Sequence, residues 1–320
     1  MTRSLGHPDM PAAVALHSFR IKLGSADTDP LPVGLPVLSG ELEECLFPEA
    51  RLAGRTGMFT LFEAGSWLVG SAALPVESTY ASVTTRLYQE LFAAVGDRRL
   101  CRIWNYVPGI NAAGADGLEN YRSFTIGRSL AFEQRFGRNF NAHLPAGSAV
   151  GSESDRLVVV FAASRVVPCY CENPAQVPAY EYPATHGPRP PSFSRATAVA
   201  EGRRLDAFVS GTAAIKGHET VGVGDTRKQL AVTLDNLRGI FAVAGLGGDL
   251  RTEGAQARHF KVYLRRADDH PLVANVLAEE LLRPGDQVSM LRADLCRAEL
   301  DVEIEATVLG TRRTLSPAGS

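Results

Sequence analysis

Four acidic side chains near the end of the chain alternate with apolar ones. They are Glu299, Asp301, Glu303 and Glu305, and each residue between them is apolar. Because successive side chains of a β-strand point to opposite faces, a strand here presents all four carboxylates on one face. A solvated outer face is the commoner explanation of such a pattern. If one carboxyl instead faces a partly closed cleft, its pKa rises, and it can serve as a general acid near neutral pH.

Arginines are the second set of side chains that could bind a substrate. Arg128 lies near the end of the first half and Arg195 at the end of the proline-rich segment in the middle of the chain, and Tyr121 precedes Arg128 by seven residues. Arginine binds carboxylates through two parallel hydrogen bonds, so converging arginines would imply a ligand with two carboxylates. The chain contains many arginines, however, and most of them must face solvent. Their spacing alone does not choose between substrate-binding and surface positions.

A metal or nucleotide site has little support in the sequence. Cys169 and Cys171 are separated by one residue, and His186 follows, but this spacing without a second cysteine pair matches no standard zinc pattern. The glycine-containing turn before Asp225 and Thr226 lacks a full nucleotide-binding fingerprint, so we interpret one of these two residues as a helix N-cap. No Gly-x-Ser-x-Gly motif of a serine hydrolase occurs. We expect no metal ion.

The overall composition disfavours several classes of protein. The 320 residues include 33 Lys and Arg against 35 Asp and Glu, for a net charge of -2, which disfavours nucleic acid as a partner. No apolar run approaches the roughly 18 residues of a membrane-spanning helix, and the first 20 residues lack a secretory signal. The five scattered cysteines argue against a disulfide framework. We therefore expect a soluble, cytoplasmic protein that binds neither nucleic acid nor membrane.

Hydrophobic periodicity predicts the elements that position these residues. The first half begins with a hairpin, followed by a helix and a strand, and then by a second helix and a strongly apolar strand. In residue numbers these are strands at 58–64 and 67–73, a helix at 83–95, a strand at 100–107, a helix at 129–136 and a strand at 157–163. The last strand is apolar without interruption, which indicates burial on both of its faces.

The second half repeats this order of elements. It contains a strand at 206–213, a helix at 230–244, a strand at 259–265, a helix at 271–282 and strands at 287–291 and 300–309. The sequence Gly-Ser-Ala-Ala that begins at Gly70 also aligns with the sequence Gly-Thr-Ala-Ala that begins at Gly211, and each precedes the helix of its half. Self-similarity of this kind indicates two related α+β domains.

The two predicted domains leave three segments outside them. We expect domains at 56–165 and 197–312, an irregular lead-in at 1–55 with one weak strand at 18–23, and a tail at 313–320. The segment at 166–196 contains seven prolines and three tyrosines. This stiff, aromatic composition predicts an extended linker that packs over a domain.

The second half resembles the YjgF/RidA-like (chorismate mutase-like) fold. The resemblance rests on Ser-Gly-Thr-Ala from Ser210, Gly-His-Glu-Thr from Gly217, Lys-Val-Tyr from Lys261 and Val-Glu-Ile-Glu-Ala from Val302, in this order. It implies a mixed β-sheet packed by helices on one face, with Glu303 near an active site. Since the first half looks like a degenerate copy, the expected fold is α+β with two such domains.

The chain as a whole is similar to the chorismatases, two-domain enzymes of this fold that cleave chorismate. The similarity extends from about residue 55 to residue 310. Its carrying residues are Cys-Arg-Ile-Trp-Asn-Tyr-Val-Pro-Gly-Ile-Asn from Cys101, Asn-Tyr-Arg-x-Phe from Asn120 together with Arg128, and Leu-Pro-Ala from Leu144, in addition to the blocks above. The resemblance implies that chorismate is the substrate and that neither a metal ion nor an organic cofactor is required.

The resemblance also implies roles for individual residues. Glu303 would protonate the enolpyruvyl ether of chorismate. The two carboxylates of chorismate would be positioned by Tyr121, Arg128 and Arg195. The other substrate-binding candidates are Thr212, Ala213 and Lys261, and the second catalytic candidate is Cys296.

The product of a chorismatase depends on two small pocket residues, which correspond here to Ala213 and Cys296. Ala213 is typical of the hydrolytic type, which gives pyruvate and trans-3,4-dihydroxycyclohexa-1,5-diene carboxylate. Cys296 is typical of the types that form 3-hydroxybenzoate, alone or with 4-hydroxybenzoate. We favour 3-hydroxybenzoate, because a polarizable thiol can assist proton movement during rearomatisation. Such a product would serve as a precursor in secondary metabolism.

Two other functions remain open on this fold. A RidA-like imine deaminase would need an arginine near the start of the penultimate strand, which has none before Arg292. A non-catalytic ligand-binding protein is the other alternative, since a fold does not determine a function. The sequence also leaves open whether the chain is a monomer or a homotrimer.

Overall fold

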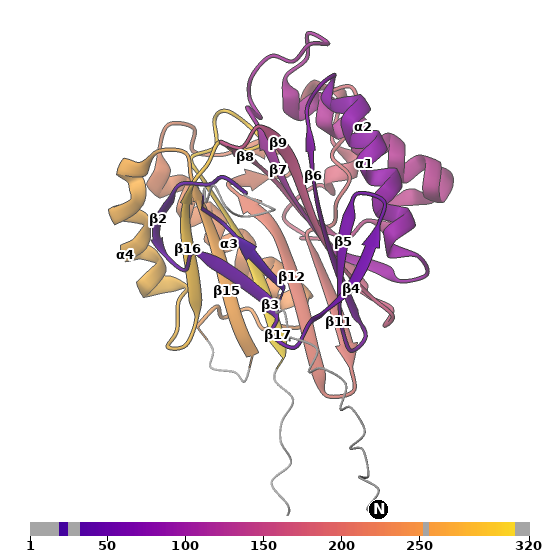
Figure 1. Ribbon diagram of the computed structural model, residues 1–320. Coiled ribbons are helices and arrows are strands. Elements are labelled where there is room, and N and C mark those ends of the chain that lie inside the picture. The colour runs from indigo at the N-terminus through magenta and orange to yellow at the C-terminus, as the bar shows by residue number, and fades with distance from the viewer. Residues whose placement is uncertain (1–18, 25–32, 252–255, 311–320) are drawn as a thin grey trace, which may run out of the picture.

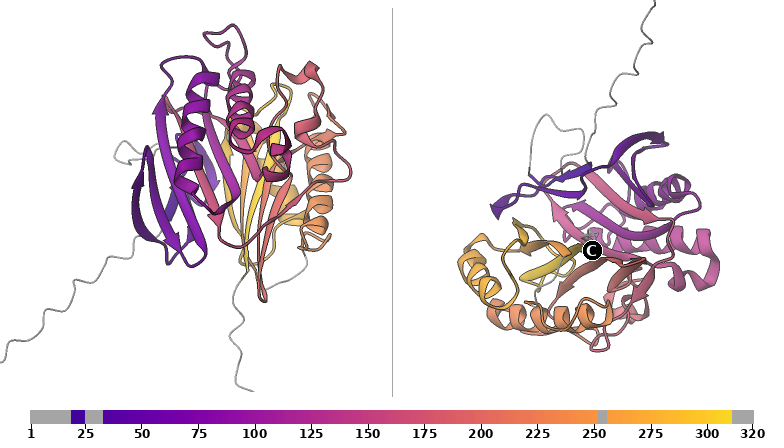
Figure 2. Two further views of the ribbon diagram at one scale, coloured as in Figure 1. Left: turned by 90° about the vertical axis from the view of Figure 1, so that its right-hand side faces the viewer. Right: turned by 90° about the horizontal axis from the view of Figure 1, so that it is seen from below.

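The computed structural model describes residues 19–24, 33–251 and 256–310. Within these ranges the chain forms two large β-sheets that pack face to face, and helices cover the outer surface of each sheet (Figure 1 and Figure 2). From one side of the molecule to the other, the layers are therefore helix, sheet, sheet and helix. This arrangement confirms the expected α+β class.

The first sheet contains six strands, of which one neighbouring pair is parallel. Its spatial order is β4 (Arg51–Thr56), β5 (Phe59–Ala64), β6 (Trp67–Pro75), β9 (Arg156–Ser164), β7 (Arg99–Pro108) and β8 (Ala146–Ser152). The parallel pair is β7 and β8. Two helices, α1 (Tyr80–Val95) and α2 (Asn120–Phe136), cover the outer face and pack an apolar cluster against it.

The second sheet contains seven strands and repeats the order of the first. Its spatial order is β10 (Cys169–Cys171), β11 (Ala196–Glu201), β12 (Arg204–Ala213), β17 (Val302–Gly310), β15 (Gln256–Leu264), β16 (Gln287–Arg292) and β2 (Val37–Gly40). Its helices are α3 (Thr226–Val243) and α4 (His270–Glu280). The run β11-β12-β17-β15-β16 corresponds to the run β5-β6-β9-β7-β8, and the last pair of each run is parallel.

Apolar side chains fill the spaces between the layers. Between the two sheets, the rings of Trp67 and Phe208 meet edge to face with centroids 5.6 Å apart. On the outer face of the second sheet, Val302, Ile304 and Ala306 of β17 pack in the same cluster as the apolar face of α3. Burial of one large apolar side chain stabilises a fold by roughly 1.5–3 kcal/mol, so these layers are a major source of stability.

The N-terminal segment differs from the irregular lead-in that we expected. It contains β1 (Phe19–Lys22) and β3 (Glu43–Phe47), which pair with each other, and β2, which adds an edge strand next to β16. The weak strand expected at 18–23 corresponds to β1, although residue 18 lies outside the described ranges. β2 and β3 were not expected, because strands of four and five residues are too short for their alternation to be detected.

The proline-rich segment and α2 also differ in detail from expectation. The segment contains β10, η2 (Ala179–Glu181) and η3 (Ala184–His186), and it buries Ala179 and Tyr182. The second helix of the first half was expected from residue 129, but α2 begins at Asn120. Its first turns bury Ser123, Thr125 and other polar residues, so they carry no apolar periodicity. The shorter elements are η1 (Gly137–His143), η4 (Ala267–Asp269), β13 (Ile215–Lys216) and β14 (Glu219–Thr220).

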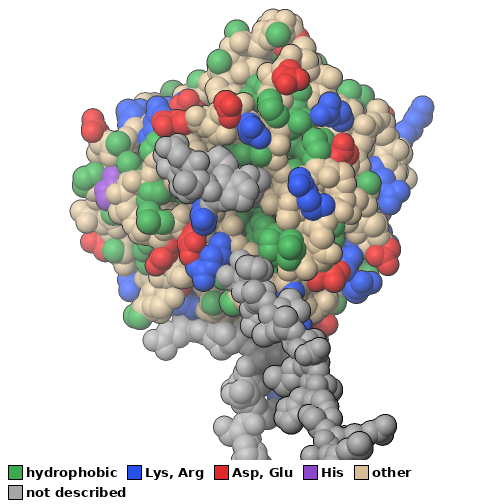
Figure 3. Space-filling view, viewed as in Figure 1, with side chains coloured by type: hydrophobic (Ala, Val, Ile, Leu, Met, Phe, Trp, Pro, Cys, Tyr) green, Lys and Arg blue, Asp and Glu red, His purple; other side chains and the backbone are tan. Residues whose placement is uncertain are grey.

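The surface carries no dominant charge on the face seen in Figure 3, where basic and acidic side chains are interspersed. This mixture agrees with the small net charge of the sequence. None of the helices in the described ranges is long and apolar enough to span a membrane. The predicted tail at 313–320 lies outside the described residues.

Candidate active site

A cavity of about 310 Å³ opens where the first turn of α2, the adjacent ends of β12 and β17, and the proline-rich segment meet. A smaller hollow of about 40 Å³ shares part of its lining and extends toward β8. Together they bring six of the eight predicted site residues to one place, namely Tyr121, Arg128, Arg195, Ala213, Cys296 and Glu303.

The acidic face of β17 is buried between the two sheets, so the commoner explanation of its pattern, a solvated face, is wrong. Glu303 is 3% exposed and Glu305 is 1% exposed, because the face they share packs toward the first sheet. Only Glu303 of these two lines the cavity. Asp301 forms an ion pair with Arg266 outside the cavity, and Glu299 lies exposed at the cavity rim before β17 begins.

A glycine makes the space that the Glu303 carboxyl occupies. A β-carbon placed on Gly211 of the adjacent β12 would overlap the Glu303 carboxyl oxygen. Gly211 faces the cavity because β12 has a bulge between Val209 and Thr212. A bulge adds a residue to one strand and thereby changes which side chains face inward. Val209 accordingly packs on the helix side of the sheet, whereas Ala213, four residues later, packs between the sheets.

Burial and, to a lesser extent, the neighbouring Glu305 carboxylate raise the pKa of Glu303 to about 8. Arg102 and Arg195 oppose these two effects. A carboxyl with this pKa keeps its proton at neutral pH, which is the state that a general acid needs. The Cys296 thiol also keeps its proton at neutral pH, because burial and the nearby Glu303 raise its pKa to about 12.

Arg128 projects from the middle of α2 into the smaller hollow and is 2% exposed. Its guanidinium lies over the ring of Tyr88 at 5.6 Å, and its Nε and Nη2 have no hydrogen-bond partner among the described residues. Gly147 of β8 gives it room, since a β-carbon there would lie 2.7 Å from Nη2. An unpaired buried guanidinium is costly unless an anion binds it, so this position suits a carboxylate of a ligand.

Arg195 lines the larger cavity, and part of its guanidinium is already hydrogen-bonded. Its Nη2 donates hydrogen bonds to the Tyr182 hydroxyl at 2.7 Å and to the Val177 carbonyl at 3.1 Å. Its Nε is 4.0 Å from a carboxylate oxygen of Glu172, a group whose pKa is raised to about 7, mainly by burial. The remaining N–H groups of Arg195 are available to a second carboxylate of a ligand.

Arg297 is a lining residue that the sequence analysis missed. Its guanidinium lies 5.4 Å from the centre of the Tyr182 ring, and its Nη1 donates to the Thr220 hydroxyl at 3.1 Å. Its Nη2 is buried without a hydrogen-bond partner in the described part of the chain. The only sequence signal was its place beside Cys296, because nothing else separated it from the many other arginines.

Two predicted substrate-binding residues lie outside both cavities, which corrects their assignment. The Thr212 hydroxyl is buried and donates to the Ser210 carbonyl, because the bulge gives Gly211 and Ala213 the inward positions. The Lys261 ammonium is buried in the layer between the sheets, 2.8 Å from Glu305 and 2.7 Å from Glu44. Lys261 thus neutralises protein carboxylates and does not reach the cavity.

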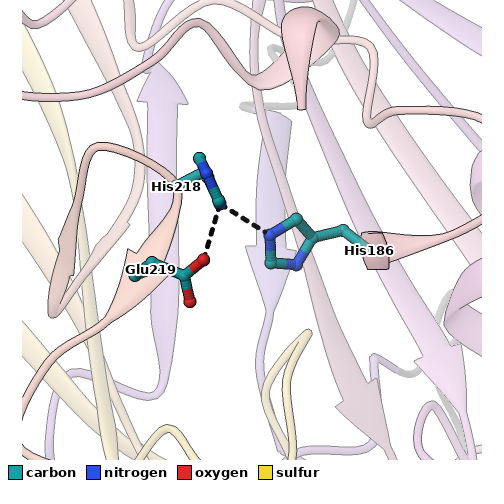
Figure 4. Close-up of side chains that lie close together, drawn as sticks. All are labelled: His186, His218 and Glu219. Atoms are coloured by element: carbon teal, nitrogen blue, oxygen red, sulfur yellow. Dashed lines mark hydrogen bonds and ion pairs between the residues drawn. The ribbon is translucent and has the colours of Figure 1, made fainter. Parts of the chain in front are cut away.

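The residues that were considered together as possible metal ligands do not all lie together in the structure. Cys169 is exposed and His186 lies elsewhere, at the cavity wall, where it approaches His218 and Glu219 (Figure 4). The Nδ1 of His218 is 3.1 Å from Nε2 of His186 and 3.0 Å from a Glu219 oxygen, so hydrogen bonds account for the cluster. Burial lowers the pKa of His186, and so do the Arg297 and His218 charges. The predicted N-cap of α3 is confirmed, since Asp225 accepts from the Lys228 backbone N–H.

Known proteins share both the sequence and the fold of this chain. The family model "Chorismatase FkbO/Hyg5-like, N-terminal" matches residues 46–163. A protein named chorismatase from Streptomyces rapamycinicus is 40% identical over 253 residues, which are 76% of this chain and 74% of that protein. A 3-hydroxybenzoate synthase from Streptomyces hygroscopicus is 35% identical over 271 residues, 80% of this chain and 78% of that protein. A crystal structure of a chorismatase superposes with a TM-score of 0.72 at 30% identity, covering 92% of this chain and 98% of the other.

Proposed function

The chain belongs to the chorismatase family, and we propose that it converts chorismate to pyruvate and 3-hydroxybenzoate. The observation that carries this proposal is the protonated Glu303 carboxyl in a cavity that also contains buried arginines with free N–H groups. The names of the relatives favour chorismate chemistry over imine deamination or simple ligand binding.

The arginines fit the charge of the substrate. Chorismate has two carboxylates, one on the ring and one on the enolpyruvyl group. Arg128 and Arg195 would each bind one of them, and Tyr121 lines both hollows between these two arginines. Fixing both ends of the substrate aligns its reactive double bond with the acid, which removes much of the entropic part of the barrier.

Glu303 would start the reaction as a general acid. Its proton moves to the terminal methylene carbon of the enol ether, which becomes a methyl group, and the positive charge spreads over the adjacent carbon and the ether oxygen. The bond between ring carbon C3 and this oxygen then breaks, and its electron pair forms the carbonyl of pyruvate. The Glu303 carboxylate that remains can accept a proton later in the cycle.

The fate of ring carbon C3 would decide the product. In the intramolecular route, the C4 hydroxyl oxygen bonds to C3 as pyruvate leaves, the resulting epoxide opens, and loss of a ring proton gives 3-hydroxybenzoate. Pyruvate and 3-hydroxybenzoate together contain all the atoms of chorismate, so no water is consumed. Cys296, a protonated thiol beside Glu303, supports this route because it can hydrogen-bond to oxygen or relay a proton near the ring.

The finer description of the fold is part of the same proposal. We infer that residues 56–165 and 197–312 are two YjgF/RidA-like domains, and the shared strand order of the two sheets supports this division. We also infer that the enzyme is cytoplasmic, which the five scattered cysteines favour, and that it needs no cofactor, since acid catalysis is sufficient for this reaction.

One experiment tests the proposed function. The purified protein is incubated with chorismate, pyruvate is measured with a coupled dehydrogenase, and the aromatic products are separated by chromatography. We expect equal amounts of pyruvate and hydroxybenzoate. The Glu303→Gln variant keeps the shape of the side chain but cannot donate the proton, so its kcat should fall about 10²-fold or more. Unchanged turnover in this variant, or dihydrodiol as the sole product of the wild type, would contradict the respective part of the proposal.

A further inference from the structure

A network of charged side chains lies between the two sheets, outside the cavity. It consists of Glu305 on β17, Lys261 on β15, Arg102 on β7 and Glu44 on β3, and each of the four is about 1% exposed. Lys261 bridges Glu305 at 2.8 Å and Glu44 at 2.7 Å, and Arg102 of the first sheet donates to Glu305. Buried ion networks are expensive to desolvate and stabilise a fold poorly, so this one calls for an explanation other than stability.

The network places a fixed negative charge next to the acid. Glu303 and Glu305 are two residues apart on the same face of β17, which separates their β-carbons by about 7 Å. Burial alone would raise the pKa of Glu305, but Lys261 and Arg102 lower it to about 2. Glu305 is therefore ionised throughout the working range of pH, and because both carboxyls are buried, its charge is screened less than a surface charge would be.

We propose that Glu305 is a positioning residue for the catalytic acid: its carboxylate, held ionised by Lys261 and Arg102, keeps the proton on Glu303. The inference rests on the proposed role of Glu303 and deepens it. Two like charges this close in a buried layer repel each other, so one carboxyl remains protonated. Lys261 and Arg102 determine which of the two carboxyls stays ionised. Both contact Glu305, and neither forms an ion pair with Glu303.

Other groups that face Glu303 act in both directions. Arg102 and Arg195 favour its ionised form, whereas the neutral Cys296 thiol and Tyr121 hydroxyl contribute no charge at neutral pH. Around Glu305, the Glu44 carboxylate and the neutral Tyr106 and Tyr263 hydroxyls complete the surroundings. Glu305 is the group in this set that both carries a negative charge and lies beside Glu303.

The test measures the proton on Glu303 directly. Infrared spectra recorded over a range of pH contain a band of buried protonated carboxyl, and the part that disappears in Glu303→Gln belongs to Glu303. In the wild type this band should titrate near pH 8. In Glu305→Gln its midpoint should fall by about one to two pH units, the shift that one unit charge about 7 Å away produces at an intermediate dielectric constant. The alkaline limb of the kcat profile should move with it.

A second variant distinguishes electrostatics from damage to the fold. Arg102→Met removes a cation that opposes the proton on Glu303, so it should move the same midpoint upward. A merely structural role for the ion pair would not give shifts of opposite sign for its two members. Glu63→Gln, at an exposed carboxylate of β5 that pairs with Arg98, is the matched control and should leave the midpoint unchanged.

Each outcome decides the inference. A Glu305→Gln midpoint equal to that of the wild type, shifts of equal sign in both variants, or a wild-type Glu303 that is already ionised at pH 7 would overturn it. Because the infrared readout needs no turnover, opposite shifts in an enzyme that fails to act on chorismate would uphold the inference about the proton and reject the proposed substrate alone.

Discussion

The two sheets have the same strand order but contribute differently to the cavity. β9 of the first sheet corresponds to β17 of the second, yet its inward positions are Val158, Val160 and Ala162, whereas those of β17 include Glu303 and Glu305. The first half instead supplies cations, from Arg102 on β7 and Arg128 on α2. The second half thus holds the acid, the first half supplies Arg102 and Arg128, and neither half contains the complete set of these groups.

The largest effect that would test this division of roles is on stability. The pKa of Glu303 is about 8 in the folded protein and 4.5 is its ordinary value. Between these two pH values the folded state binds a proton that the unfolded state has lost, so the wild type loses stability as pH rises from 4.5 to 8. The Glu303→Gln variant does not lose stability in this way, because glutamine does not titrate. It should therefore be more stable than the wild type at pH 8, by about 3–5 kcal/mol, and similar to it at pH 4.5.

Thermal or urea unfolding at several pH values measures this difference. Glu63→Gln, which removes an exposed carboxylate of the first sheet, is the control, and its stability should differ little from that of the wild type at every pH. A Glu303→Gln variant that is less stable than the wild type at pH 8 would show that burial of the Glu303 carboxyl does not destabilise the folded protein at this pH.

A second prediction concerns the cation from the first half. Arg128→Ala should raise KM and lower kcat together, with a loss of about 10–100-fold in kcat/KM, because a charged hydrogen bond contributes about 1.5–3 kcal/mol and misplaced substrate reacts slowly. Arg195→Ala should behave similarly. Arg128→Lys should not restore activity fully, since an ammonium cannot bind a carboxylate in the planar, two-bond geometry.

Steady-state kinetics with chorismate as substrate decide this prediction. Arg135→Ala removes an exposed arginine from the last turn of the same helix and should keep wild-type values. Normal kinetics in both the Arg128 and the Arg195 alanine variants would mean that the substrate carboxylates bind elsewhere.

A third prediction uses the two glycines that align in sequence. Gly211 lies against Glu303, whereas Gly70 lies against the ring of Phe161 in the outer cluster, because only β12 has a bulge at this place. Gly211→Ala should displace the acid and lower kcat about tenfold or more. Gly70→Ala should lower the melting temperature through overpacking and leave the kcat of the folded enzyme close to normal. The opposite pattern would show that the two positions had not diverged in this way.

The smallest effect is on product composition. Cys296 precedes β17, and the equivalent turn of the first half, at residues 153–155, has no thiol. Cys296→Val should allow water to compete at C3 and divert part of the flux to the dihydrodiol, with only a modest change in kcat. Chromatography of the products measures the ratio, and Cys169→Val, at an exposed cysteine, is the control. An unchanged ratio would assign product choice to Ala213.

Sequence patterns predicted most of the elements, including the strand that carries Glu303, but not the environment of this strand. The alternation predicted at 299–305 holds within β17, where Glu303 and Glu305 share one face and the apolar residues the other, whereas Glu299 and Asp301 lie before the strand begins. Whether that face meets water depends on contacts between residues about 200 positions apart, such as Arg102 and Glu305. No local pattern contains this information, and this is why a solvated face was the first interpretation.

The errors at Thr212 and Lys261 have related causes. A regular strand would place Thr212 on the same face as Phe208, and one additional residue at the bulge reverses this. Lys261 was correctly placed in the sheet, but its partner Glu44 comes from a short strand that the sequence did not reveal. Arg297 was missed because an arginine that completes a cavity has no local signature.

The position of β2 at the edge of the second sheet has a consequence for the order of events during synthesis. Ser39 pairs in register with Met290, and Glu44 accepts a hydrogen bond from Thr307, so β2 and the Glu44 side chain find these partners only in β16 and β17. During synthesis β3 can pair with β1, but β2 has no strand partner until some 250 further residues have been made. Contacts of such high sequence separation fold slowly. The sheet that carries the acid is therefore completed only after β16 and β17 have been made.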